Sequence, residues 1–120
     1  MADELRPATR EETALIEHLL AAADVPTHDI RAQLDGLQVM SDCTCGCPSV
    51  ALYPANATAS NRAETPASGP TLEICADCPE GLITLFVRRG CLMTLELAHE
   101  SGEVAGAWPP IEALGAPTLT

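Results

Sequence analysis

The second half of the chain has a period-two pattern of side chains that two turn sequences interrupt. Leu72, Ile74 and Ala76 alternate with Glu73, Cys75 and Asp77, and the segment 82–87 is apolar. In 91–97, apolar residues occupy every second position and are expected to face one side: Cys91, Met93, Leu95 and Leu97. Cys78-Pro79-Glu80-Gly81 has the proline and glycine of a type I turn, and Arg88-Arg89-Gly90 is typical of a hairpin loop. Because successive side chains of a strand point to opposite faces, this pattern predicts three antiparallel strands joined by tight turns.

Two more strands are expected earlier in the chain. The residues from Leu37 to Cys43 alternate with a period of two, and a second short strand is expected at 50–53, after the Gly46-Cys47-Pro48 break. The complete sheet is therefore expected to contain four to five strands.

The N-terminal part of the chain has helical periodicity instead. Thr9 is followed three residues later by Glu12, which forms a capping box, and apolar residues then recur at helical spacing. The helix is expected to end just before Pro26, since a proline disfavours helical geometry in the residue that precedes it. A second, shorter helix is expected within 27–36, a segment that ends in glycine.

These elements predict an α+β fold in which two N-terminal helices pack on an antiparallel sheet of four to five strands. The length of 120 residues suits a single domain, 1–120. Residues 54–70 contain no large apolar side chain, so we expect a mobile loop there. An irregular C-terminal tail is expected from about residue 101 onward, with Trp108 docked on the domain.

The chain is strongly acidic and has no lysine. Seventeen Asp and Glu residues stand against six arginines, which gives a net charge of −11. This charge repels phosphate backbones and anionic lipid, so we expect no nucleic-acid or membrane partner, and it favours a basic protein partner. No apolar run approaches the ~18 residues of a membrane span. The acidic start Met1–Glu4 differs from a signal peptide, so we expect a cytoplasmic protein.

The six cysteines are the residues best suited to carry chemistry. Cys43, Cys45 and Cys47 form a C-x-C-x-C run, and Cys75 and Cys78 have the spacing of a zinc knuckle. A structural zinc ion takes four tetrahedral ligands, typically from two close pairs. These five thiolates are therefore a candidate site for zinc, or for a softer ion such as Cu(I) or cadmium.

Two other interpretations of the cysteines remain open. If the strand from Leu37 continues, the cysteines of 43–47 lie on its core face and pack as small apolar side chains, as Cys91 is also expected to do. Redox or disulfide chemistry is the third interpretation. Cys75-x-x-Cys78 lacks the helix start that lowers the pKa of a redox thiol, which disfavours a thioredoxin-like role.

Parts of the chain resemble known but uncharacterised proteins. The segment Leu5–Leu20 is similar to the opening of a group of small bacterial proteins. The segment Cys45-Gly46-Cys47-Pro48-Ser49-Val50-Ala51-Leu52 and the strand Leu82–Val87 with its hairpin resemble small actinobacterial proteins of unknown function. The resemblance covers about half the chain and implies a compact α+β fold with no established activity. An immunity or accessory role is one function that the resemblance implies. The Cys75/Cys78 pair is not part of the sequence pattern that these proteins share.

No catalytic constellation is evident. His18, His28 and His99 have no ligand spacing to one another, and the carboxylates are scattered, so we expect no enzymatic activity. The sequence therefore predicts a small acidic, non-enzymatic interaction domain that binds a protein, with a basic protein as the favoured partner. The alternative is a small metalloprotein in which the five cysteines at 43, 45, 47, 75 and 78 hold zinc or a softer metal.

Overall fold

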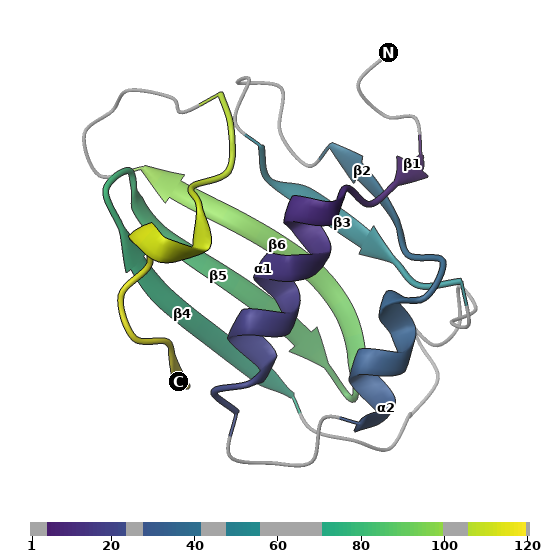
Figure 1. Cartoon of the computed structure of the whole chain (residues 1–120). Coiled ribbons are helices and arrows are strands. Elements are labelled where there is room, and N and C mark those ends of the chain that lie inside the picture. The colour runs from purple at the N-terminus through teal and green to yellow at the C-terminus, as the bar shows by residue number, and fades with distance from the viewer. Residues whose placement is uncertain (1–4, 24–27, 42–47, 56–70, 100–105, 120) are drawn as a thin grey trace.

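The fold is built on one antiparallel sheet with its helices on one side (Figure 1). The computed structural model describes residues 5–23, 28–41, 48–55, 71–99 and 106–119. Within them, seven strands pair in the order β1-β2-β3-β6-β5-β4-β7. The strands are β1 Arg6–Pro7, β2 Gln38–Ser41, β3 Val50–Tyr53, β4 Leu72–Cys78, β5 Gly81–Arg88, β6 Cys91–His99 and β7 Thr118–Leu119. The helical elements are α1 Arg10–Leu20, α2 His28–Arg31, and the 3₁₀ turns η1 Ala32–Leu34 and η2 Ile111–Ala113.

The prediction of two N-terminal helices on a sheet of four to five strands is wrong. The described residues form a mostly β fold with seven strands and one helix of several turns, α1. The expected second helix is only the four-residue α2 followed by η1. The two additional strands, β1 and β7, are two residues long and pair at the sheet edges. Segments this short cannot display a period-two pattern, which explains why the sequence did not predict them.

The three-stranded meander is confirmed. β4 pairs with β5 along its whole length, and β5 pairs with β6 with one register shift between Phe86 and Val87. The β5–β6 hairpin turns through Arg89 and Gly90, whose φ angles are 51° and 80°. Two successive positive φ angles are what a two-residue hairpin loop requires to match the twist of its strands.

Helix α1 begins where the capping box predicts. The backbone N–H of Glu12 donates to Thr9 Oγ1 at 3.1 Å, and the backbone N–H of Thr9 donates to Glu12 Oε1 at 2.9 Å. The apolar stripe of the helix then packs against the inner side of the sheet. Its buried side chains are at most 1% exposed and comprise Leu15, Ile16, Leu19 and Leu20.

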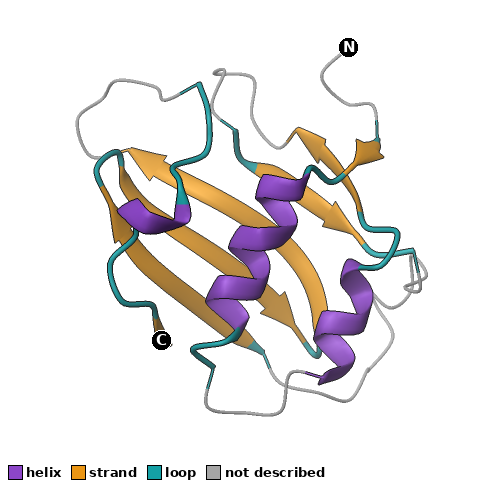
Figure 2. Ribbon diagram, viewed as in Figure 1, coloured by secondary structure: helices purple, strands orange, loops and turns teal. Residues whose placement is uncertain are grey.

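The opposite side of the sheet carries no described helix. Figure 2 shows α1, α2 and the η2 turn all in front of the strands. The inward residues of the central strands, such as Leu52, Ile83 and Leu95, are completely buried. Their strand neighbours point the other way. We call this second side the open face, defined by the outward residues Met40, Ala51, Tyr53, Glu73, Cys75, Asp77, Leu82, Thr84, Phe86, Thr94, Glu96 and Ala98.

Parts of the predicted organisation lie outside the described residues. Of the expected mobile loop 54–70, only Pro54 and Ala55 are described. In the expected C-terminal tail, residues 106–119 contain η2 and β7, and the backbone N–H of Gly115 donates to the carbonyl of Asp77 at 2.8 Å. This part of the tail therefore runs beside the edge of β4. None of the described helices combines the length and apolar character that crossing a membrane requires.

Candidate functional site

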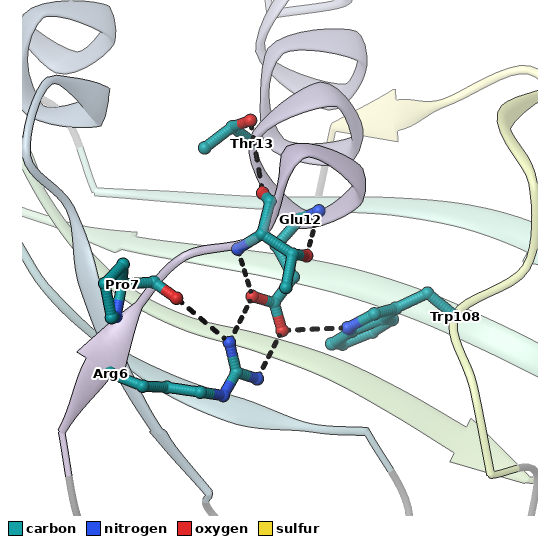
Figure 3. Close-up of polar contacts among 6 residues, drawn as sticks. Arg6, Pro7, Glu12, Thr13 and Trp108 are labelled. Carbon is teal, nitrogen blue, oxygen red and sulfur yellow. Dashed lines mark hydrogen bonds and ion pairs between the residues drawn. The ribbon is translucent and has the colours of Figure 1, made fainter.

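A buried carboxylate, Glu12, gathers groups from three separate segments (Figure 3). The Arg6 guanidinium donates to both Glu12 oxygens, with N···O distances of 2.9 Å. The indole Nε1 of Trp108 donates to Oε2 at 3.1 Å, and the backbone of Thr9 donates to Oε1. Glu12 is only 1% exposed. These four donors fill the lone-pair sites of the carboxylate, so the buried charge is fully hydrogen-bonded.

The same donors keep Glu12 ionised. Burial alone raises the pKa of this carboxyl, but the hydrogen bonds from Arg6, Thr9 and Trp108 outweigh burial and leave the pKa below its ordinary value. An ionised carboxylate without a free lone pair cannot serve as a general acid, and it has no site at which to accept a proton from a substrate. The cluster therefore has a structural role: it fastens β1 and the C-terminal segment to the start of α1. Trp108 docks on its own domain, as the sequence predicts.

The structure does not bring Cys75 and Cys78 to the same side of β4. Cys75 lies on the open face, where its Sγ is 3.5 Å from Thr84 Oγ1. Cys78 packs instead against the hydrophobic core. Residues three apart in a strand point to opposite faces, so this spacing separates the two thiols here, whereas in a zinc-knuckle turn it brings them together.

The other proposed metal ligands, Cys43, Cys45 and Cys47, lie outside the described residues. In the part of the chain that the structure does describe, no group of three or more His, Cys, Asp and Glu side chains is placed to hold a metal ion. The five-cysteine site therefore stays a prediction. Cys91, by contrast, is 4% exposed, which confirms its expected burial.

The environment of Cys78 disfavours a reactive thiolate. Burial raises the pKa of this thiol, the nearby Glu80 carboxylate raises it further, and the backbone amides of Gly81 and Glu80 only partly offset both effects. The thiol is therefore protonated at neutral pH. The thiolate is the form of cysteine that attacks an electrophile, so Cys78 is a poor nucleophile in this position.

Replacing Cys75 with serine should change the free energy of unfolding by no more than about 0.5 kcal/mol, because the position is partly exposed and a serine hydroxyl can also contact Thr84. Urea denaturation of both proteins, with and without added zinc, measures the difference. A loss of several kcal/mol together with loss of bound zinc would contradict this expectation and support the metalloprotein alternative.

The open face combines an apolar centre with carboxylates. Paired residues form rows across β4, β5 and β6, and Phe86 lies between Glu73 and Thr94 in one of them. In the next rows, Leu82 is the neighbour of Asp77, and Thr84 is the neighbour of Glu96. This arrangement places apolar side chains between negative charges on a surface that no described helix covers.

This surface was not predicted, although the sequence contains a signal for it. In an ordinary half-exposed sheet the outward positions are polar, whereas here they include Met40, Tyr53, Leu82 and Phe86. Large apolar residues on both sides of a strand indicate that one side packs on the core and the other side binds a partner.

Comparisons of the chain with protein-family models, with curated proteins and with solved structures found no match. The resemblance to small bacterial proteins therefore stays an expectation from the sequence.

Proposed function

We propose that this chain is a non-enzymatic interaction protein that binds a basic protein partner through the open face. The observation that carries the proposal is the side of the sheet that no described helix covers, where Tyr53, Leu82 and Phe86 are only partly buried (Figure 2). Glu73 and Asp77 of β4 are the strand neighbours of Phe86 and Leu82, and Glu96 of β6 is the neighbour of Thr84, which lies between those two residues on β5.

Each part of this surface has a distinct energetic role. Removing apolar area from water contributes about 25 cal/mol per Å², so the aromatic and aliphatic side chains supply affinity. The carboxylates attract a basic partner over a distance and disfavour acidic ones, so they supply association rate and specificity.

The net charge of −11 also argues against a second copy of the same chain as the occupant. Two strongly acidic surfaces repel each other, and the repulsion grows as the ionic strength falls. The attraction between the open face and a basic partner, by contrast, grows as the ionic strength falls. An immunity-like role, in which an acidic protein covers a basic one, is one form of the proposed function.

The test uses a defined probe: a labelled peptide in which lysine and leucine alternate. The unmodified chain should bind it at low salt, with amide chemical-shift changes centred on Leu82, Thr84 and Glu96. The triple variant Glu73→Gln/Asp77→Asn/Glu96→Gln should bind about tenfold more weakly, because three partly solvated charges at about 0.5 kcal/mol each add up to about 1.5 kcal/mol, and tenfold corresponds to about 1.4 kcal/mol. Fluorescence anisotropy measures both dissociation constants.

A matched variant separates a local effect from an effect of net charge. Glu11→Gln/Glu17→Gln/Glu112→Gln removes the same three charges from exposed positions on α1 and η2. This variant should bind the peptide within about twofold of the unmodified chain, since its open face is unchanged. Equal weakening in the two variants, shift changes centred on α1, or no binding at low salt would each overturn the proposal.

A further inference from the structure

A groove lies at the end of the open face, beside the β5–β6 hairpin. Its volume is about 650 Å³, and its lining includes Phe86, Arg88, Arg89, Met93 and Thr94. Small-molecule sites typically occupy about 300–1,000 Å³ and combine an apolar lining with a few polar groups. The groove has this size and this composition, so it is large enough for a ligand of its own.

The two arginines at this groove are a local exception in an acidic chain. Arg6 is engaged by Glu12, whereas the side chains of Arg88 and Arg89 form no hydrogen bond or ion pair with any described residue. Both residues are exposed. Each guanidinium carries five N–H donors in a planar fork, which matches the two oxygens of a carboxylate.

The backbone that presents these arginines is held from both sides. Gln33 of η1 donates its Nε2 to the carbonyl of Gly90 at 2.6 Å and accepts from the N–H of Leu92 at 2.9 Å. On the other side, the N–H of Arg89 donates to Thr71 Oγ1 at 3.1 Å. A hairpin fixed in this way loses little conformational entropy when a ligand binds.

Arg89 also occupies an unusual backbone conformation. Its φ of 51° is in the left-handed region, where glycine, asparagine and aspartate are the residues usually found in hairpin turns. A long, branched guanidinium side chain gives no conformational advantage at this position. Strain of this kind concentrates at ligand-binding sites, and here it places a second positive charge beside Arg88.

The remaining lining restricts the charge and shape of the ligand. Phe86 and Met93 offer an aromatic ring and a thioether, both of which favour a flat or flexible apolar body. Glu73 also lines the groove, and the chain has a net charge of −11, so a ligand with several negative charges is repelled. With Glu73 in the lining and a strongly acidic chain around it, the two arginines favour a ligand with a single negative charge.

We propose that this groove binds small monocarboxylates with an apolar or aromatic body. The carboxylate is bound by the guanidinium groups of Arg88 and Arg89, and the body packs on Phe86 and Met93. This site shares Glu73, Phe86 and Thr94 with the open face, but it goes beyond the proposed binding of a basic protein because it depends on the arginines rather than on the carboxylates.

The probe is 2-naphthoate, and the measurement is an amide chemical-shift titration of the full chain. At about 0.3 kcal/mol per non-hydrogen atom, a ligand of this size is expected to bind with a dissociation constant of about 1 mM. The shifts should centre on Phe86, Arg88 and Thr94. The variant Arg88→Gln/Arg89→Gln should weaken binding at least about tenfold, as expected for charge-assisted hydrogen bonds.

Three comparisons make the test decisive. Arg10→Gln/Arg31→Gln removes two exposed arginines elsewhere and should leave the dissociation constant within about twofold. The neutral alcohol 2-naphthalenemethanol should bind the unmodified chain at least about tenfold more weakly than 2-naphthoate. Glu73→Gln should strengthen naphthoate binding, whereas it contributes to the weakening of peptide binding in the triple variant above.

Four results would each overturn the site. The two arginine variants could weaken binding equally, or the neutral alcohol could bind as tightly as 2-naphthoate. The chemical-shift changes could lie outside the groove, or 10 mM 2-naphthoate could cause no shift changes. Those results leave the lysine–leucine peptide test unaffected, so failure of the groove is distinguishable from failure of the proposed function.

Discussion

Replacing Glu12 with alanine should lower the free energy of unfolding by about 3 kcal/mol, through loss of the capping box and of the charge-assisted bonds to Arg6 and Trp108. The indole N–H of Trp108 and the backbone N–H of Thr9 would both lose an acceptor. Urea denaturation, followed by the fluorescence of the single tryptophan, measures the loss and also reports release of the C-terminal segment.

Glu11→Ala is the matched control for this variant. It removes the same charge from the same helical turn, but Glu11 is exposed, so its replacement should cost about 0.5 kcal/mol or less. Glu12→Gln should have an intermediate effect, because its amide oxygen still accepts a hydrogen bond while its NH₂ group faces the donors. If the alanine variants at 11 and 12 had equal effects, the buried cluster would not stabilise the fold.

The pH dependence of stability gives a second readout of the same cluster. The folded-state pKa of Glu12 is lowered from the ordinary value of 4.5, with burial opposing the shift and the hydrogen bonds from Arg6, Thr9 and Trp108 outweighing it. The unfolded chain therefore takes up this proton first as the pH falls. The stabilisation is complete above about pH 4.5 and is lost as the pH falls through the folded-state pKa. The Glu12→Gln variant should lack this component of acid sensitivity.

The elements that the sequence predicted correctly are those with local signals. The capping box of α1 depends on residues three apart, and the β4–β5–β6 meander depends on alternation within each strand and on two tight turns. The stripe of α1 and the inward residues of the strands identify the core for the same reason. Hydrophobic periodicity shows which side of an element is buried. The structure buries the apolar residues at these spacings on α1 and β4: Leu15, Ile16, Leu19 and Leu20, and Leu72, Ile74 and Ala76.

The elements that were missed depend on contacts between distant residues. The docking of Trp108 was expected, but its partner Glu12, 96 positions away, was not. Likewise, β7 pairs with Ile74 and Cys75 from the far end of the chain. No spacing rule connects such residues. A second helix was expected within 27–36 because its apolar spacing is helical, but the segment forms one turn of α2 and then η1. Gln33 of η1 bonds to the β5–β6 hairpin, so tertiary contacts determine the path of this segment.

The Arg88/Arg89 groove illustrates the same limit. The sequence identified Arg88-Arg89-Gly90 as a hairpin loop, and the turn is present. The loop acquires a binding surface only because Phe86 and Met93 lie beside it and Thr71 holds its backbone. The chemistry of the site therefore comes from the sheet register rather than from a motif.

Replacing Leu19 with alanine should lower the free energy of unfolding by about 2–5 kcal/mol. Leu19 is completely buried in the contact between α1 and the inner side of the sheet, and a rigid β sheet cannot collapse into the space that its side chain leaves. The cost therefore includes both the lost burial of the side chain and the cavity.

Thr9→Ala and Glu17→Ala show whether this effect comes from packing or from the helix itself. Thr9→Ala removes the cap of α1 and should cost about 1 kcal/mol, and Glu17→Ala changes an exposed position of the same helix and should cost about 0.5 kcal/mol or less. Denaturant midpoints at constant m-value rank the three variants. If Leu19→Ala cost no more than Thr9→Ala, α1 would not be held by its apolar stripe. Its attachment to the sheet would then depend on the Glu12 cluster alone.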